Sequence, residues 1–288
     1  MRPALLLLLL MAPLPLAAQQ SVERGAAAAP SVSIRAYNLA GSIRVIGWDR
    51  DSVHVSASLA TGSRLYFGGS RTALKLGVEA AASPGATPPS ELVLHVPDGA
   101  RVWLKSATAS ADVEGIDGEV DVSTVSGNIQ VRGDPSLLAA ESMEGSLDID
   151  GSASVLRLKS AGGSISFEGF GGDLTVSTVS GNIQLNVSGP VATGRVESVT
   201  GKISWAGPVS PAGSLDLQTH GAHIQLTLPL GQDAEIDVSA FSGKVINGFP
   251  SARRAAPSGK PVRYTLGDGS AHIAVRSLKG GVTIEAAQ

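Results

Sequence analysis

Nine consecutive residues occur twice in this chain: Val122–Gln130 and Val176–Gln184 both read Val-Ser-Thr-Val-Ser-Gly-Asn-Ile-Gln. Weaker copies fill the interval between them, and the glycine recurs every 18 residues at Gly127, Gly145, Gly163 and Gly181. A short fixed period is typical of repeat architectures, in which each unit buries its apolar face against its neighbours. The repeat therefore constrains the fold more than any other feature of the chain.

Each repeat contains two runs of alternating apolar and polar residues joined by a glycine-containing turn. In the clearest copy, Val120, Val122 and Val125 precede the turn, and Ile129 and Val131 follow it. Alternation in a strand places such apolar residues on one face. Eighteen residues are too few for two strands and a crossover helix. The sequence thus predicts an all-β, single-domain parallel β-solenoid (β-helix) with coils of about 18–21 residues.

Equivalent positions of successive repeats form two columns, which we expect to stack inside the coil. The column before the turn contains Leu104, Val122, Ala140, Leu158, Val176, Val196, Leu217 and Val238. The column after the turn contains Val113, Ile129, Leu147, Ile165, Ile183, Ile203, Ile224, Val245 and Ile273. A local six-residue spacing also fits a three-sided left-handed coil, through Val125, Val131, Leu137, Met143, Ile149 and Val155. Because Asp173 interrupts that spacing, we favour a right-handed coil with two or three faces.

The first 18 residues have the pattern of a secretory signal peptide: Arg2, an apolar run over Ala4–Met11, and then Pro13 and Pro15. An uncleaved anchor is disfavoured because the apolar run is much shorter than the ~20 residues that span a bilayer. We expect residues 19–30 to be a flexible linker and residues 31–288 to form the solenoid domain. The protein is then exported, to the periplasm or to the extracellular side of the cell surface.

Two segments interrupt the strand pattern. Ala80–Ser90 is rich in Ala, Pro and Ser and predicts a loop, and Phe249–Pro261 predicts an excursion that contains Arg253 and Arg254. We interpret the two arginines as solvated. The strand edges at the ends of a solenoid are unpaired, so we expect the N-terminal segment and the final stretch through Val282–Ile284 to serve as caps.

Composition excludes several classes of function. The chain has no cysteine, which rules out disulfides, thiolate metal sites and a lipid-modified cysteine. It has 22 basic and 25 acidic residues with no basic block, so nucleic-acid binding has no electrostatic support. No stretch after the signal is apolar and long enough to span a membrane. The oligomeric state is left open.

Catalytic β-helices need acids and bases gathered on one outward face. Here the acids are scattered: Asp121 and Asp173 fall near corresponding positions, as do Asp148 and Asp216. We interpret them, together with Asp150, as single solvated residues on a polar outer face. Three or more acids and bases converging on one groove would instead favour an enzyme.

Histidines are the alternative candidates. His223 and His272 are expected to share the outward column that holds Asn128, Asn182, Lys202 and Lys244, but too far apart for one ion. His220 replaces Val125, Val179 and Val199 in a column that we expect to be packed. We therefore predict no catalytic, cofactor-binding or metal-binding residues, and no cofactor.

Other motifs have structural interpretations. The chain lacks the tandem glycine-aspartate nonapeptide of calcium-binding β-rolls and a Gly-x-Ser-x-Gly elbow. Gly162-Gly163 and Gly171-Gly172 lie at coil corners with no following helix to hold a phosphate. We expect Asn128 and Asn182 to stack as a ladder at the turns. The Thr and Ser positions form no sustained array of the kind that binds ice.

The chain resembles the bacterial putative-adhesin family, domains of unknown function with repeated Ser-Gly-Asp/Asn-Ile turns. The resemblance rests on Gly41–Asp51 followed by Val53–Val55, on Val96–Gly99, and on the repeated Thr-Val-Ser-Gly-Asn-Ile. It extends from about Ser31 to Ile284. It implies a β-solenoid at the bacterial cell envelope with an adhesive, scaffolding or stress-sensing role, and it supplies no catalytic residues.

These observations lead to a non-enzymatic, exported β-solenoid that acts in adhesion or scaffolding at the cell envelope. A long polar wall suits shallow contacts with envelope glycans or surface proteins. One alternative is a carbohydrate-active β-helix enzyme, a polysaccharide lyase or hydrolase. Another is a self-assembling or partner-docking protein that uses its exposed strand edges.

Overall fold

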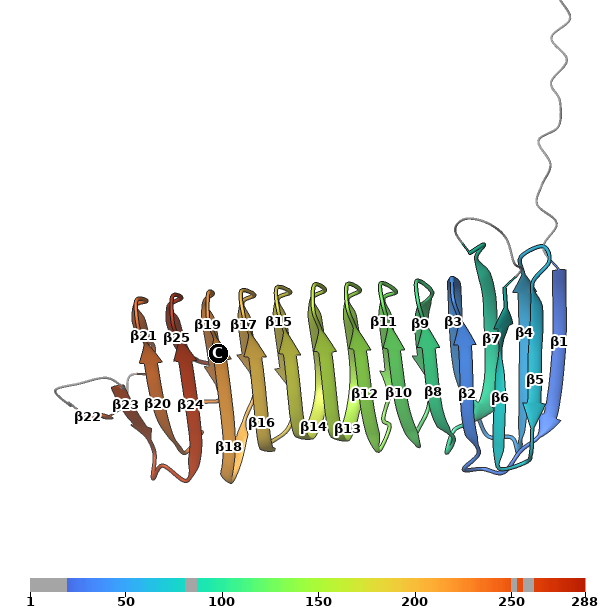
Figure 1. Cartoon of the computed structure of the whole chain (residues 1–288). Coiled ribbons are helices and arrows are strands. Elements are labelled where there is room, and N and C mark those ends of the chain that lie inside the picture. Colours follow the sequence, from blue (N-terminus) through green and yellow to red (C-terminus); the bar gives the residue numbers. More distant parts are fainter. Residues whose placement is uncertain (1–19, 81–86, 250–252, 256–261, 288) are drawn as a thin grey trace, which may run out of the picture.

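The repeats form the coils of a long rod, seen from the side in Figure 1. The computed structural model describes residues 20–80, 87–249, 253–255 (backbone only) and 262–287. The predicted signal peptide and parts of the two predicted interruptions lie outside the described residues. Every regular element among the described residues is a strand, and none of them forms a helix that could cross a membrane.

Two stacks of parallel strands form the long sides of the rod, which we name wall A and wall B. In their spatial order, the strands of wall A are β6 (Ala73–Glu79), β2 (Ser33–Asn38), β8 (Arg101–Ser106), β10 (Glu119–Thr124), β12 (Leu137–Ser142), the second halves of β13 (Leu147–Ser160) and β14 (Ile165–Thr178), β16 (Val191–Ser198), β18 (Val209–Thr219), β24 (Ala271–Ser277) and β20 (Ala234–Ala240).

Wall B is built in the same way from the strands that follow each turn. Its strands are β7 (Ser90–Pro97), β3 (Gly41–Trp48), β9 (Ser110–Glu114), β11 (Ile129–Gly133), the first halves of β13 and β14, β15 (Ile183–Val187), β17 (Ile203–Ala206), β19 (Ile224–Leu228), β25 (Val282–Ala286) and β21 (Val245–Asn247). Because β13 and β14 continue from one wall into the next, the walls belong to one sheet.

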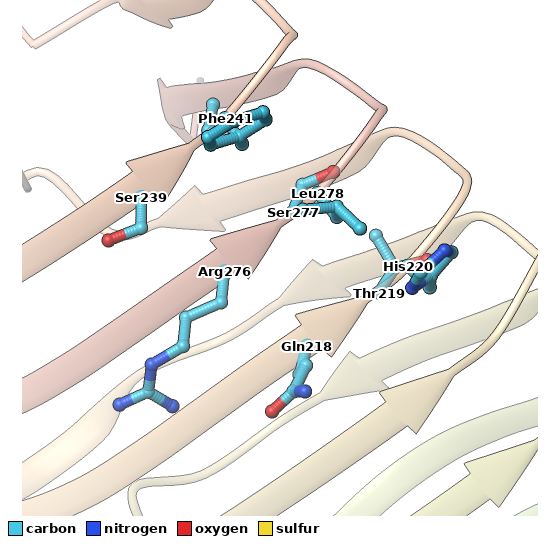
Figure 2. Close-up of a pocket in the computed structure, with 9 residues that line it drawn as sticks. Gln218, Thr219, His220, Ser239, Phe241, Arg276, Ser277 and Leu278 are labelled. Carbon is cyan, nitrogen blue, oxygen red and sulfur yellow. The ribbon is translucent and has the colours of Figure 1, made fainter. Parts of the chain in front are cut away.

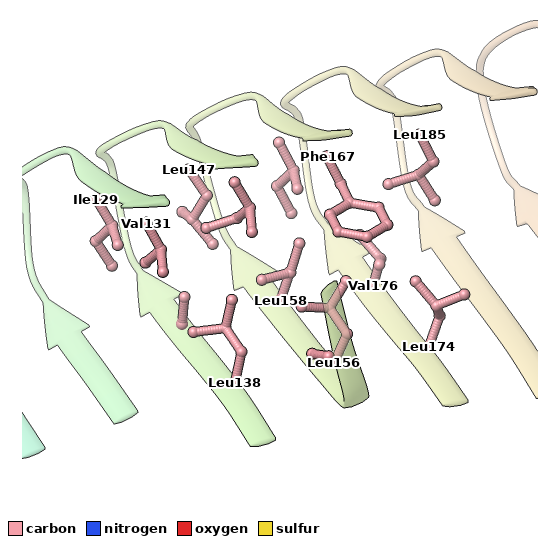
Figure 3. Close-up of a cluster of buried hydrophobic side chains, with 14 of the residues drawn as sticks. Ile129, Val131, Leu138, Leu147, Leu156, Leu158, Phe167, Leu174, Val176 and Leu185 are labelled. Atoms are coloured by element: carbon pink, nitrogen blue, oxygen red, sulfur yellow. The ribbon is translucent and has the colours of Figure 1, made fainter. Parts of the chain in front are cut away.

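The core lies between the walls. Figure 3 shows Ile129, Leu147 and Phe167 of wall B facing Leu138, Leu158 and Val176 of wall A. Each of these six side chains is at most 2% exposed to solvent. Alternation along each strand sends every second residue inward, so each coil adds aliphatic side chains to a continuous core.

The predicted columns are largely confirmed, with errors at their ends. The column before the turn has the predicted register, except that Val275 stands between Leu217 and Val238. In the second column, Ala111 and not Val113 pairs with Ile129. Ile273 belongs to wall A, and Val282 enters the column between Ile224 and Val245.

The six-residue spacing is wrong as a description of the core. Val125 and Met143 are 48% and 57% exposed, because the residue that follows each wall-A strand begins the turn and points outward. The coil has two walls, within the predicted range of two or three faces.

Buried hydroxyl groups hold the turns in place. At several turns the preceding residue is a buried Ser or Thr whose Oγ accepts a hydrogen bond from the backbone N–H three residues later, as Ser160 does from Gly163 at 2.9 Å. Ser160 Oγ also donates to the Gly145 carbonyl oxygen of the neighbouring coil at 3.3 Å. The Ser160 hydroxyl therefore links its own turn to that of the neighbouring coil. The series contains Thr124, Ser142, Ser160, Thr178, Ser198, Thr219 and Ser277.

Chain order and spatial order differ at both ends of the rod. The last coil, β24 and β25, lies between the coil of β18 and β19 and the coil of β20 and β21. Near the N-terminus, the coil of β2 and β3 lies between that of β6 and β7 and that of β8 and β9. The final stretch is thus an internal coil, and our prediction that it caps the rod is wrong.

Antiparallel strands complete the ends. At one end, β4 (Ser52–Leu59) pairs with β7, β1 (Gln20–Ala27) pairs with β4, and β5 (Arg64–Gly69) pairs with β6. At the other, β23 (Val262–Leu266) pairs with β20, and β22 (Arg253–Ala255) pairs with β23. The fold is therefore a mixed, β-solenoid-like sheet rather than a purely parallel one. The prediction of a flexible linker over 19–30 is wrong for residues 20–27, which form β1 and pair with β4.

Candidate functional site

An exposed row of apolar side chains runs along the edge of the rod where the tight turns lie, at the top of Figure 1. We name it the ridge. It takes one residue from each coil, directly after the wall-A strand: Leu39, Ala107, Val125, Met143, Ala161, Val179, Val199, His220, Leu278 and Phe241. Seven of these are 40–69% exposed: Leu39, Val125, Met143, Val179, Val199, Leu278 and Phe241.

The nearest outward column of wall A runs parallel to the ridge, and we name the strip between the two rows the furrow. The column consists largely of polar residues: Tyr37, Lys105, Ser123, Glu141, Lys159, Ser177, Glu197, Gln218, Arg276 and Ser239. At two places along this strip the surface is hollowed into a groove. The groove over β18, β24 and β20 has a volume of about 370 Å³, and the one over β12, β13 and β14 has about 280 Å³.

Figure 2 shows the larger groove. Gln218, Arg276 and Ser239 stand in one row on successive strands, and His220, Leu278 and Phe241 stand in a parallel row. One side thus offers hydrogen-bonding groups and the other mostly apolar surface. In the smaller groove the corresponding rows are Glu141, Lys159 and Ser177, and Met143, Ala161 and Val179.

The charges of the furrow are balanced locally. Arg276 Nη1 donates to both carboxylate oxygens of Asp216, at 2.7 and 2.9 Å. Lys159 Nζ lies 3.1 Å from Glu141 Oε1. A ligand of the furrow therefore meets paired charges, amides and hydroxyls, and no concentrated charge of one sign.

A further groove, of about 300 Å³, lies on wall A above the small side chain of Ala139. Asp121 and Arg157 line it on either side of Ala139. Burial raises the pKa of the Asp121 carboxyl above its ordinary value, against the opposing effect of Lys105. The outer surface of wall A is therefore hollowed at several coils.

Acids and a base converge at the end of wall A. Ligand atoms of Glu235, Asp237 and His272 lie within 4.8 Å of one another. Arg263 already bonds both acids, with Nη1 at 3.0 Å from Glu235 and Nε at 2.7 Å from Asp237. Its hydrogen bond lowers the pKa of Asp237, so this carboxyl stays ionised and is a poor proton donor. The guanidinium supplies the positive charge that a metal would bring.

The other predicted acids remain apart. Asp148 and Asp150 lie exposed on wall B, where Asp148 accepts a hydrogen bond from Gln130 at 3.2 Å. Asp121 and Asp173 occupy different columns of wall A, since Asp121 pairs with Ala139 and Asp173 with Val155. Asp216 lies on the opposite wall from Asp148, so the proposed correspondence of these two is wrong.

The histidines are also distributed differently from the prediction. His223 precedes β19 at the turn, in the column of Asn128, Asn182, Lys202 and Lys244, as predicted. His272 pairs with Ser214 and Glu235 in wall A and is not in that column. His220 lies in the column of Val125, Val179 and Val199, but the column is exposed and not packed.

The asparagine residues lie at the turns as predicted, but the predicted ladder is wrong, because Ser146 and Ser164 stand between Asn128 and Asn182 in the column. Asn128 Oδ1 accepts hydrogen bonds from the backbone N–H of Ser146 at 3.0 Å and from its hydroxyl at 3.1 Å. Asn182 Oδ1 accepts one from the backbone N–H of Lys202 at 3.0 Å. Both side chains therefore link neighbouring coils.

Sequence reasoning missed the ridge. The signal was present in the apolar residue that precedes the Ser-Gly or Thr-Gly pair of these turns, but Val125 was grouped with the inward residues Val120 and Val122 against the alternation of the strand. Val125 follows Thr124, which points inward, so strict alternation already places Val125 outside.

Comparison with known proteins identifies the family. The family model described as Toastrack DUF4097 matches residues 86–285, more than half of the chain. The chain belongs to the Toastrack family. This confirms the resemblance to a family of adhesin-like domains without established function. No curated protein matches this Toastrack chain in sequence.

Three solved structures align with most of the chain at low sequence identity. A structure named "putative adhesin" from Bacteroides fragilis is 11% identical, with a TM-score of 0.34, and the match covers 94% of this chain and 99% of that one. A "putative adhesin" from Parabacteroides distasonis is 10% identical, with a TM-score of 0.34 and coverage of 94% and 98%. A "putative cell adhesion protein" from Clostridium sporogenes is 9% identical, with a TM-score of 0.24 and coverage of 93% and 100%.

Proposed function

We propose that this Toastrack protein is an exported, single-domain, non-enzymatic β-solenoid that binds an extended polymer of the cell envelope, in adhesion or as a scaffold. The observation that carries the proposal is the furrow, which repeats the same pair of polar and apolar rows from coil to coil. A repeating furrow offers many equivalent shallow contacts rather than one deep pocket.

A glycan is the polymer that fits these rows best. Sugar rings combine hydroxyl groups on their rims with apolar C–H faces. Gln218, Arg276 and Ser239 offer donors and acceptors to hydroxyls, while Leu278 and Phe241 offer apolar surface to the ring faces. Surface proteins remain the second class of partner.

The enzyme alternative has one supporting observation, the cluster of Glu235, Asp237 and His272. Arg263 holds both of its acids as ion pairs. A glycosidase or lyase needs a protonated acid or a free base beside the scissile bond. The pairing with Arg263 therefore favours a structural role for this cluster.

Retention on envelope fractions tests the proposal. The purified mature chain is incubated with separated peptidoglycan, outer-membrane material and surface polysaccharide, and the supernatants are assayed for released sugars. We expect saturable retention on a polysaccharide-containing fraction without released sugar. Released oligosaccharide would establish the enzyme alternative, and absence of retention on all fractions would contradict polymer binding.

A further inference from the structure

The turns along the ridge differ in charge between the two halves of the rod. The five turns at the C-terminal end are residues 179–182, 199–202, 220–223, 241–244 and 278–281. They contain three lysines, two histidines and no acid, although the chain as a whole carries a net charge of −3. We name these five turns the basic corner.

The five turns of the other half show the reverse. Residues 39–42, 107–110, 125–128, 143–146 and 161–164 contain Glu144 and no Lys, Arg or His. The two halves share the same turn geometry and the same apolar ridge. The positive charge is therefore a property of one end of the edge and not of the repeat itself.

The three lysines of the basic corner are exposed and keep their charge available. Lys202, Lys244 and Lys279 form no ion pair with any described carboxylate within 4.0 Å, whereas Lys159 is paired with Glu141. An unpaired ammonium group at a convex edge attracts anions with little loss of hydration on the protein side.

Exposed apolar side chains lie among these lysines. Val199, Leu278 and Phe241 are 45%, 40% and 69% exposed, and they belong to the same turns as Lys202, Lys279 and Lys244. In Figure 1 the turns form one long, nearly straight edge of the rod. Such an edge presents its cations and its apolar side chains together to a flat partner.

We propose that the basic corner docks on an anionic lipid surface, with the ridge side chains at the boundary of headgroups and acyl chains and the lysines at the headgroup phosphates. Interfacial binding combines buried apolar area with attraction to anionic lipids in this way. This inference goes beyond the polymer-binding function and uses the edge of the rod.

A second copy of the chain fits this surface less well. The basic corner spans five coils spaced ~4.8 Å apart and is ~10 Å wide, so its contact area is roughly 240 Å². This is well below the ~800 Å² that each partner buries in a stable complex. Two basic corners would also repel each other. A soluble polyanion would use the lysines but leave the apolar row in water, so a bilayer accounts for both features.

Flotation with vesicles tests the inference. The mature chain is mixed with vesicles of phosphatidylglycerol and phosphatidylethanolamine, or of phosphatidylcholine alone. We expect binding to the anionic vesicles that weakens as salt is added. The triple variant Lys202→Ser, Lys244→Ser, Lys279→Ser should lower the partition coefficient about fivefold per lysine, or about a hundredfold in total.

Two further variants provide the controls. The triple variant Arg24→Ser, Arg71→Ser, Arg157→Ser removes the same charge outside the basic corner and should bind anionic vesicles like the parent chain. Val199→Ser with Leu278→Ser keeps the lysines and should also weaken binding. Thermal unfolding by circular dichroism verifies that each variant folds, and the salt dependence of the parent chain requires no variant.

Three outcomes would overturn the inference. Equal binding to anionic and neutral vesicles would remove the role of charge. An equal loss of vesicle binding in the lysine and arginine triple variants would show that binding does not depend on the basic corner. Unchanged vesicle binding by the Val199 and Leu278 variant, with lysine-dependent binding to dextran sulfate, would identify a soluble polyanion as the partner. None of these outcomes affects retention of an uncharged glycan in the furrow, so the two proposals fail separately.

Discussion

Leu217 and Val275 are register partners in adjacent parallel strands, although they lie 58 positions apart (217 to 275). Val275 pairs on its other side with Val238, which is closer to Leu217 in the chain. The last coil therefore fills a gap between two coils that precede it in sequence. The coil of β20 and β21 therefore depends on β24 and β25 for its pairing with the rest of the rod.

Truncation at Gly269 tests this dependence. The shortened chain lacks β24 and β25, through which β20 and β21 pair with the rest of the rod. We expect the amides of β20 and β21 to lose protection in hydrogen exchange, while those of β10 and β12 keep theirs, because stability in stacked repeats depends on nearest neighbours. Full protection of β20 in the truncated chain would contradict the interleaved order.

A buried hydroxyl provides a second test. Ser160→Ala removes the acceptor of the Gly163 N–H and the donor to the Gly145 carbonyl oxygen. Leaving a buried group without its partner costs about 1–3 kcal/mol. We expect a loss of this size in chemical unfolding. The control Ser164→Ala, at an exposed position of the same turn, should change the free energy of unfolding by less than ~0.5 kcal/mol. Equal effects would argue against the hydroxyl series.

Two neighbouring glycines differ in the space around them. A Cβ on Gly163 would clash with the backbone oxygen of Gly145 in the adjacent coil, whereas the nearest atom to a Cβ on Gly162 is 3.6 Å away. We expect Gly163→Ala to destabilise the protein by about 1–3 kcal/mol through overpacking, and Gly162→Ala to be nearly neutral. Thermal unfolding of both variants measures the difference, and a neutral Gly163→Ala would contradict the close stacking of the turns.

Asp121 and Asp237 predict opposite dependences of stability on pH. Burial raises the folded-state pKa of Asp121, so its contribution favours folding below the unfolded pKa of ~3.9 and is lost as pH rises through the folded value. Asp121→Asn should therefore stabilise the protein at pH 7 and have little effect at pH 3. Denaturant unfolding at both pH values measures this, and destabilisation at pH 7 would contradict it.

Asp237 has the reverse sign. Its bond to Arg263 lowers the folded-state pKa, so its contribution is present above the unfolded pKa of ~3.9 and is lost as pH falls through the folded value. Because the pair is partly exposed to solvent, we expect a loss of no more than ~1 kcal/mol for Asp237→Asn at pH 7. The loss should vanish at acidic pH, and a loss that grows on acidification would contradict this assignment.

The sequence pattern predicted which residues of a coil face inward and which lie at its turn. It did not predict which coils are neighbours in the rod. Alternation and the glycine period placed Val122, Leu158 and Ile183 inside and Asn128 at a stacked turn. The alternation of apolar and polar residues in β24 is compatible with any position in wall A, because neighbouring strands present equivalent apolar residues at every position. The interleaved ends and the antiparallel strands follow from long-range pairing that no repeat encodes.

The sequence failed to predict the ridge for a different reason. The exposed positions of Val125, Val179 and Val199 follow from the turn geometry, but apolar residues are ordinarily expected inside. Interpreting them as core residues therefore predicts no exposed apolar row at this edge of the rod. Only the positions of the neighbouring coils show that these side chains form one continuous row.

The most direct test of the central claim compares two substitutions in the same region of the rod. Ala161→Gln fills the furrow between Met143 and Val179, while Ser166→Gln adds the same side chain to wall B, beside Gln184. Saturation of retention on purified envelope polysaccharide is measured for both and for the parent chain. The account predicts weaker retention for Ala161→Gln and parental retention for Ser166→Gln. Equal retention by all three would contradict polymer binding in the furrow.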